Sequence, residues 1–287
     1  MTKTQIKALS FTKTFYSRGF IVYAASVIVL VFVVSAIFAP LFTKYDPNAI
    51  DLSSSLATPS SEHLFGSDLH GRDVFTRLLY GARVSLLLSI FSCIVGATVG
   101  MVLGLIAGYR EGILGALIMR YVDLQLAIPP MLFTIIIGMI AGQTMFGLIF
   151  ALSFGMLPGF IRLMYGLVLS LKQNDYIIAL RFANISSPKI IFKHLLPNTF
   201  PTMLVTISMN LGSTIMLEST LSFLGIGIQQ PQASWGSMVA DGYSYIFTRP
   251  FLAFVPGICI VLLVLSLNIL GDSLRDAIDP RLKGKLQ

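Results

Sequence analysis

The sequence predicts an all-α, polytopic membrane protein with six transmembrane helices. Hydrophobic residues make up 55% of the 287 residues and charged residues only 11%, whereas a soluble domain is about a quarter charged. Long apolar stretches recur along the chain, without the alternating segments of about ten residues that form an outer-membrane barrel. This composition excludes an ordinary soluble enzyme and a disordered protein.

Six stretches approach the length of about 20 apolar residues that a bilayer-spanning helix needs. We interpret the first as a retained signal anchor, because it is too long for a signal-peptide core and lacks a small-x-small cleavage site. The apolar region after the second stretch is interrupted by Arg120, Asp123 and two prolines, so we expect a short interfacial helix before the third span. The predicted spans are residues 19–42, 84–109, 124–142, 145–171, 199–225 and 251–271.

The distribution of Lys and Arg predicts that both termini are cytoplasmic, because these residues are enriched on that side of membrane proteins. With six spans, one side carries fourteen of them, in both tails, the segment 172–198 and the connection before the third span. The opposite side carries five, and its segment 43–83 also holds five acidic residues. The net charge of +7 therefore reflects orientation in lipid, and we expect no nucleic-acid partner.

The spans divide the chain into three parts. Residues 1–83 hold the N-terminal tail, the first span and an outside loop, residues 84–273 the five-helix core, and residues 274–287 a cytoplasmic tail. Within the core, the inside segment 172–198 has an apolar periodicity with turn residues at 184–188, which predicts two short helices. A folded hairpin between two spans indicates a docking surface for a soluble partner.

The second span carries four glycines, spaced four residues apart on one helix face: Gly96, Gly100, Gly104 and Gly108. Small residues let a neighbouring backbone approach closely in lipid. We interpret this face as packing within the bundle, with a subunit interface as the alternative.

Polar residues within the spans are candidates for a translocation pathway or for contacts between helices, because they are costly in lipid. Six such residues are Arg162, Asn210, Glu218, Ser219, Asn268 and Asp272. Arg120 and Asp123 are three residues apart, a spacing at which charges on a helix can pair.

The sequence lacks the patterns of a chemical active site. It holds no G-x-x-x-x-G-K-[ST] phosphate loop and no Ser/His/Asp, Cys/His or H-E-x-x-H pattern. Its two cysteines, Cys93 and Cys259, lie in apolar stretches and predict neither a disulfide nor a metal site. We therefore expect no catalytic residue, no bound metal and no cofactor in this chain.

The inside segment reads DYIIALRF from residue 175, then Asn184, then IIFKHLLPN over 190–198. It resembles the cytoplasmic "EAA" loop of ABC importer permeases, which runs E-A-A-x-x-x-G and ends in I-x-x-H-x-L-P-N. Further stretches resemble the C-type permease subunits of dipeptide, oligopeptide and nickel importers. They are LFGSD at 64–68, GRD at 71–73, RLLYGAR at 77–83, RYVD at 120–123, ESTLSFLG at 218–225, SWG at 234–236 and DPR at 279–281.

The resemblance implies an ABC type I importer permease fold and a non-catalytic role in a bacterial or archaeal cytoplasmic (inner) membrane. In this family two homologous permeases form the pathway, and an extracytoplasmic binding protein delivers a peptide or a related solute such as nickel, a metal chelate or glutathione. Two ATPase subunits, which hold ATP and Mg²⁺, dock on the coupling loops. Here the matching coupling positions are Asp175, Ile178, Ala179, Leu180, Asn184, His194, Leu196 and Pro197.

The coupling loop departs from the family pattern at three positions. Ile178 stands at the glutamate position, Leu180 at the second alanine and Asn184 at the glycine. Asparagine is the best substitute for glycine at a left-handed helix end, so we expect the turn to be kept. Because position 178 lacks a carboxylate, we expect coupling through shape and apolar contact.

Three other functions compete with a pathway subunit of an ABC importer. A stand-alone secondary transporter would need internal repeats and intramembrane ion ligands, and a membrane enzyme would need an active-site set. An ABC peptide-export or resistance permease would share the same fold. The long outside loop with its family motifs favours import with a binding protein.

Overall fold

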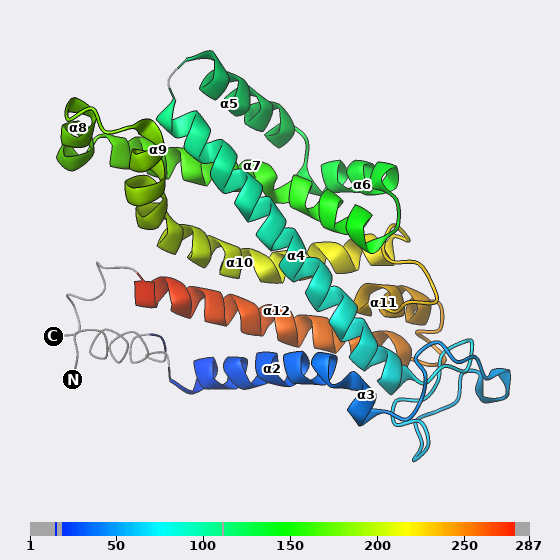
Figure 1. Cartoon of the computed structure of the whole chain (residues 1–287). Helices are drawn as coiled ribbons and strands as arrows, with labels where there is room; N and C mark the ends of the chain where they lie inside the picture. Colours follow the sequence, from blue (N-terminus) through cyan, green and yellow to red (C-terminus); the bar gives the residue numbers. More distant parts are fainter. Residues whose placement is uncertain (1–14, 16–18, 111, 279–287) are drawn as a thin grey trace.

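Long helices run between two opposite ends of the molecule in the computed structural model, which describes residues 15, 19–110 and 112–278 (Figure 1). One end holds the short helices α8 (Asp175–Phe182) and α9 (Ser187–Ile190). The other end holds α3 (Ala39–Phe42), the turn η1 (Leu52–Ser54) and α11 (Trp235–Tyr243). Five helices of the described residues are long and apolar enough to cross a membrane, and there are six crossings if one bent pair counts as a single span, in agreement with the predicted fold class.

The long helices match the predicted spans but extend beyond several of them. They are α2 (Phe20–Ile37), α4 (Val74–Tyr109), α7 (Met145–Lys172), α10 (Leu196–Phe223) and α12 (Phe251–Ile278). Asp73 sets the start of α4, since its carboxylate accepts a hydrogen bond from the backbone N–H of Thr76 at 2.7 Å. Its 36 residues make a helix of about 54 Å, longer than the hydrocarbon core of about 30 Å. The first turns of α4 therefore belong to the end that holds α3 and α11, which we call the outer end (Figure 1).

The expectation of a single crossing helix over 124–142 is wrong. The structure has α5 (Ile113–Leu126) and α6 (Pro130–Ala141), bent by 98° at a short break. The two prolines at 129 and 130 explain the break, since proline lacks the N–H of a helix and disfavours helical geometry in the preceding residue. At 12 residues α6 is about 18 Å long, so only the bent pair together can make the crossing.

The fifth span begins earlier than residue 199. A π-helical turn, η2 (Ile191–Leu195), joins α9 to α10, so that the helix is continuous from Ser187 to Phe223. The second short helix predicted in the inside segment is confirmed, but it is the first part of this crossing helix.

The four glycines of α4 pack against α7. A Cβ atom added at Gly100 would lie 2.4 Å from the Cβ of Phe160, and one at Gly104 would lie 2.6 Å from the Cβ of Met164. Real Cβ atoms do not approach other atoms this closely, so α4 and α7 can meet only because these residues are glycines. The interpretation as packing within the bundle is confirmed.

At the outer end, Trp235 joins α11 to the crossing helices. Its indole is buried among apolar residues of α2, α4 and α12, and its Nε1 donates a hydrogen bond to the carbonyl oxygen of Leu78 at 2.9 Å.

Of the tail residues used to predict orientation, Lys3, Lys7, Lys13, Arg18, Arg281, Lys283 and Lys285 lie outside the described residues.

Candidate functional site

The inside segment folds as an anchored helix with an exposed face. In α8, Ile177 is fully buried and contributes to an apolar cluster with Val168 of α7 and Ile190 of α9. The exposed face of α8 carries Tyr176, Ile178, Ala179 and Phe182. One side of the helix is thus fixed to the bundle while the other is free to meet a partner.

Asn184 forms the left-handed turn that ends this helix. Its φ is +54°, and the N–H of Ile185 donates to the carbonyl oxygen of Leu180 at 3.1 Å. This hydrogen bond closes a helix end of the Schellman type. The expectation that asparagine keeps the turn of the family pattern is confirmed.

The other coupling positions lie at the same end of the molecule. Asp175 is the exposed first residue of α8, and the ring of His194 lies 6.5 Å from the ring of Tyr176. Leu196 and Pro197 begin α10, with Leu196 packed against the buried cluster and Pro197 exposed.

Sequence reasoning missed the aromatic side chains of this surface. Phe182 follows the apolar periodicity of the segment, yet it and Phe192 of η2 are strongly exposed. The sequence feature that could have predicted this exposed surface is the presence of large apolar residues in a charged, water-facing loop. We call Tyr176, Ile178 and Phe182, the exposed large apolar residues of α8, the coupling surface.

Glu218 is the most deeply buried of the six polar residues that the sequence analysis selected in the spans. Its Oε1 accepts a hydrogen bond from the hydroxyl of Ser222 at 2.8 Å, and the hydroxyls of Ser85 and Ser234 also lie against its carboxyl group. Ser219 is buried beside it on α10. The four serines come from α4, α10 and the turn before α11, so the group joins three elements.

The remaining polar residues occupy separate places. Arg162 of α7 forms an ion pair with Asp123 of α5 at 2.5 Å, so Asp123 pairs across helices rather than with Arg120. The amide of Asn210 donates to a carbonyl of its own helix, while Asn268 of α12 lies against Gly212 of α10. Asp272 is half-buried near the end of α12. The structure does not bring these residues together into one site.

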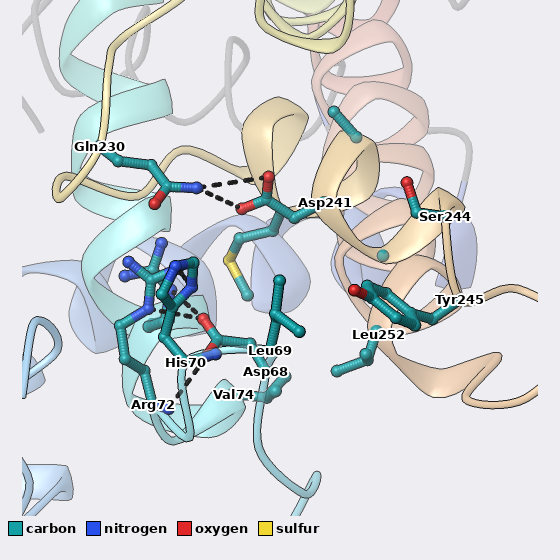
Figure 2. A pocket seen from close by; sticks show the side chains of 14 residues that line it. Asp68, Leu69, His70, Arg72, Val74, Gln230, Asp241, Ser244, Tyr245 and Leu252 are labelled. Carbon is teal, nitrogen blue, oxygen red and sulfur yellow. Dashed lines mark hydrogen bonds and ion pairs between the residues drawn. The ribbon is translucent and has the colours of Figure 1, made fainter. Parts of the chain in front are cut away.

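A polar pocket of about 260 Å³ opens at the outer end, between the segment 68–77 and α11. Figure 2 shows Asp68 with Arg72 on one wall and Gln230 with Asp241 on the other. Asp68 accepts from Nε of Arg72 at 2.6 Å and lies 3.5 Å from Nε of Arg77. Arg77 is almost fully buried and also donates to the carbonyl oxygens of Pro47 and Pro231.

Asp241 lies at the mouth of this pocket, and the amide of Gln230 donates to it at 3.2 Å. Desolvation by the pocket walls raises the pKa of Asp241 above its ordinary value, although Arg77 and Arg72 act in the opposite direction. The pocket holds charges of both signs that largely neutralise one another. It has no nucleophile placed beside a base, so it gives no indication of a chemical active site.

Comparisons with known proteins agree with this arrangement. Residues 100–284 match the family described as "Binding-protein-dependent transport system inner membrane component", and residues 21–59 match the "N-terminal TM domain of oligopeptide transport permease C".

Curated relatives align with most of the chain. The dipeptide transport system permease protein DppC of Alkalihalophilus pseudofirmus is 39% identical, covering 90% of this chain and 84% of the relative. The glutathione transport system permease protein GsiD of Pectobacterium atrosepticum is also 39% identical, covering 93% and 89%.

The fold also matches a chain of the MetNI methionine ABC transporter, solved in inward-facing conformations. The TM-score is 0.58, with 18% sequence identity, covering 71% of this chain and 97% of that chain. Permeases of this kind work with ATPase subunits and a substrate-binding protein. The chain therefore belongs to the binding-protein-dependent transport system inner membrane component family, the non-catalytic, multi-pass permease subunits of ABC importers.

Proposed function

We propose that this chain is one of two homologous permease subunits of an ATP-driven importer that carries peptides, glutathione among them, across the cytoplasmic membrane. The relatives named for dipeptides and glutathione align over about nine-tenths of the chain, which supports this solute class. The observation that carries the proposal is the coupling surface, an exposed apolar patch on a helix anchored by Ile177.

The coupling surface is proposed to face the cytoplasm. The segment that carries it also carries Lys172, Arg181, Lys189 and Lys193, as expected for a cytoplasmic loop. Figure 1 places the start of α2 and the end of α12 toward this same end of the molecule. Both termini would then be cytoplasmic, while α11 and the segment 43–73 would meet the extracytoplasmic binding protein.

Two ATPase subunits are proposed to dock on the coupling surfaces of the two permeases, and ATP and Mg²⁺ would be held by those subunits. A short amphipathic helix can place its apolar residues in a groove of a soluble partner. Ile178, Tyr176 and Phe182 would supply apolar anchors at this contact. Asp175, three residues before Ile178, is the acidic residue nearest in sequence to the position where the family pattern has glutamate.

The proposal is tested by purifying the tagged chain in mild detergent and identifying the proteins that accompany it by mass spectrometry. We expect a second permease and one or two ATPases with phosphate loops, whose ATP hydrolysis rises when a binding protein loaded with peptide is added. Recovery of the folded chain alone, bound to a small solute, would contradict the proposal and support a secondary transporter.

A further inference from the structure

The exposed faces of the crossing helices differ in chemistry. On α4 the exposed residues are apolar except for Thr98, and those of α12 are apolar as far as Leu265, with Asn268 and Arg275 exposed farther along the helix. The exposed apolar residues of α4 are Leu87, Ile90, Phe91, Ile94, Val95, Val99 and Val102. Faces of this composition are suited to the hydrocarbon core of a bilayer.

In contrast, α10 carries a stripe of hydroxyl and thioether side chains. Its members are spaced alternately by four and three residues, so they share one face of the helix. They are Thr202, Thr206, Met209, Ser213, Met216 and Thr220. The hydroxyls of Thr206, Ser213 and Thr220 donate to carbonyls of their own helix at 2.8–3.0 Å, so this face is polar but presents no unpaired donor from those three groups.

The stripe points away from α4. The hydroxyl of Thr214 lies 3.2 Å from Cys93 of α4, and Glu218 lies against Ser85 of α4. Met216 lies two residues after Thr214 and two residues before Glu218. Two residues correspond to about 200° around an α-helix, so Met216 is on nearly the opposite side of α10 from both. The stripe is therefore on the side of α10 that is turned away from α4.

Arg162 points away from α4 for the same reason. Phe160 and Met164 of α7 pack on the glycines of α4, and Arg162 is two residues from each, again about 200° around the helix. Because α7 and α10 both pack against α4 and against each other, Arg162 and the stripe lie on the same side of the molecule. We call this surface the far face.

An ion pair on the far face cannot be covered by lipid at low cost. The side chains of Arg162 and Asp123 are 51% and 52% exposed, although Arg162 lies ten residues, or about 15 Å, from the end of α7. Charged residues within membrane-spanning segments are unfavourable in hydrocarbon and ordinarily face water or protein. The neighbouring Gly159 and Gly166 leave space around the pair, because a Cβ added at either would meet nothing within 4 Å.

We propose that the far face is the wall of the water-filled path of the transported solute, and that Arg162 and Asp123 are its charged groups. This inference rests on the proposed importer function and adds the surface that serves it. Aspartate is depleted from subunit interfaces, so the half-exposed Asp123 favours water over a second permease. One charge of each sign suits a zwitterionic peptide better than a bare cation.

Cysteine accessibility in the assembled complex tests this proposal. Met216→Cys and Met209→Cys report on the stripe, with exposed fractions of 56% and 36% at these residues. Matched controls are Ile258→Cys on α12 and Val99→Cys on α4, with exposed fractions of 55% and 42%. The probe is a charged, water-soluble methanethiosulfonate, which reacts with the thiolate that forms in water. The unmodified chain gives the background from Cys93 and Cys259.

We expect the stripe cysteines to react at least about tenfold faster than the controls, as thiols in lipid do not ionise readily. Equal rates in the two sets would overturn the proposal. So would protection of Met216→Cys together with disulfide cross-linking to the second permease, which would identify the far face as a subunit contact. Co-purification of the ATPases is scored separately, so a failed importer assignment is distinguishable from a misplaced path.

Discussion

The carboxyl group of Glu218 accepts a hydrogen bond from the hydroxyl of Ser222 at 2.8 Å, and both residues are buried. Ser222 in turn accepts from the hydroxyl of Ser234, which caps the start of α11. The chain of hydrogen bonds links the outer end of α10 to α11. Because α11 is held to α4 by Trp235, the carboxyl group helps to fix the corner through which α10 is connected to the outer end.

Replacement of Glu218 tests this role. Glu218→Gln keeps an oxygen that can accept from Ser222, so we expect a folded protein of nearly unchanged stability. Glu218→Leu removes the acceptor of the buried Ser222 hydroxyl, at a cost of about 1–3 kcal/mol. Thermal unfolding in detergent measures the difference. If the leucine variant were as stable as the wild type, the hydrogen bonds of Glu218 would have no structural importance.

The contact between α4 and α7 gives a second prediction. A Cβ at Gly104 would lie 2.6 Å from the Cβ of Met164 and 2.7 Å from the carbonyl oxygen of Ile161. Gly104→Ala should therefore force the helices apart, and overpacking of this kind costs about 1–3 kcal/mol. Gly257→Ala in α12 is the control, because its added Cβ would meet nothing within 4 Å. A melting temperature lowered equally in both variants would contradict this account.

Features set by local pattern were predictable from the sequence. The crossing helices follow from apolar length, the glycine contact from the spacing of four, and the turn at Asn184 from the left-handed preference of asparagine. All of these depend on residues close together in the chain, where spacing determines geometry.

Features set by tertiary contact were not predictable. The prolines at 129 and 130 indicated an interruption, but the angle of 98° depends on how α5 and α6 pack on α7. Asp123 had a local partner in Arg120, yet it pairs with Arg162 of another helix. The serines around Glu218 lie more than a hundred residues apart in sequence, at 85 and 234, and no pattern in the chain connects them.

Asp241 predicts a pH-dependent effect on stability. Desolvation raises its pKa above 3.8 in the folded protein, so ionisation disfavours the folded state as the pH rises through that range. Asp241→Asn removes this penalty and should raise the melting temperature at pH 7. The gain should disappear as the pH falls toward 4. A gain that persisted at pH 4 would exclude ionisation as its cause.

Asp51 is a control for Asp241, because its pKa is shifted in the opposite direction. Hydrogen bonds from Ser53 and Ser54 lower its pKa, so its ionised form stabilises the folded outer segment at neutral pH. Asp51→Asn should lower the melting temperature at pH 7, and the difference should fade when acid protonates the wild-type carboxylate. Melting temperatures that change in opposite directions for the two variants at pH 7 would identify the local environment, rather than net charge, as the cause.

Phe182 provides a test of the coupling surface. It is strongly exposed at the end of α8, and truncation of an aromatic anchor in an interface costs about 2 kcal/mol or more. Phe182→Ala should therefore weaken ATPase association by roughly tenfold or more without changing the melting temperature of the isolated chain. Phe247→Ala, at the fully exposed Phe247 between α11 and α12, should leave association unchanged. Co-purification in detergent measures both, and an equal loss would contradict the assignment.

Ile178 tests how the loop couples without the carboxylate of the family pattern. Its side chain is exposed beside Tyr176 and Phe182 on the coupling surface. If the partner groove is apolar here, Ile178→Glu places a charge where desolvation is unfavourable, and solute-stimulated ATP hydrolysis should fall. Ile178→Leu keeps the apolar contact and should preserve the stimulation. A several-fold rise with Ile178→Glu would instead show that the native loop couples weakly and that the partner retains a site for the missing carboxylate.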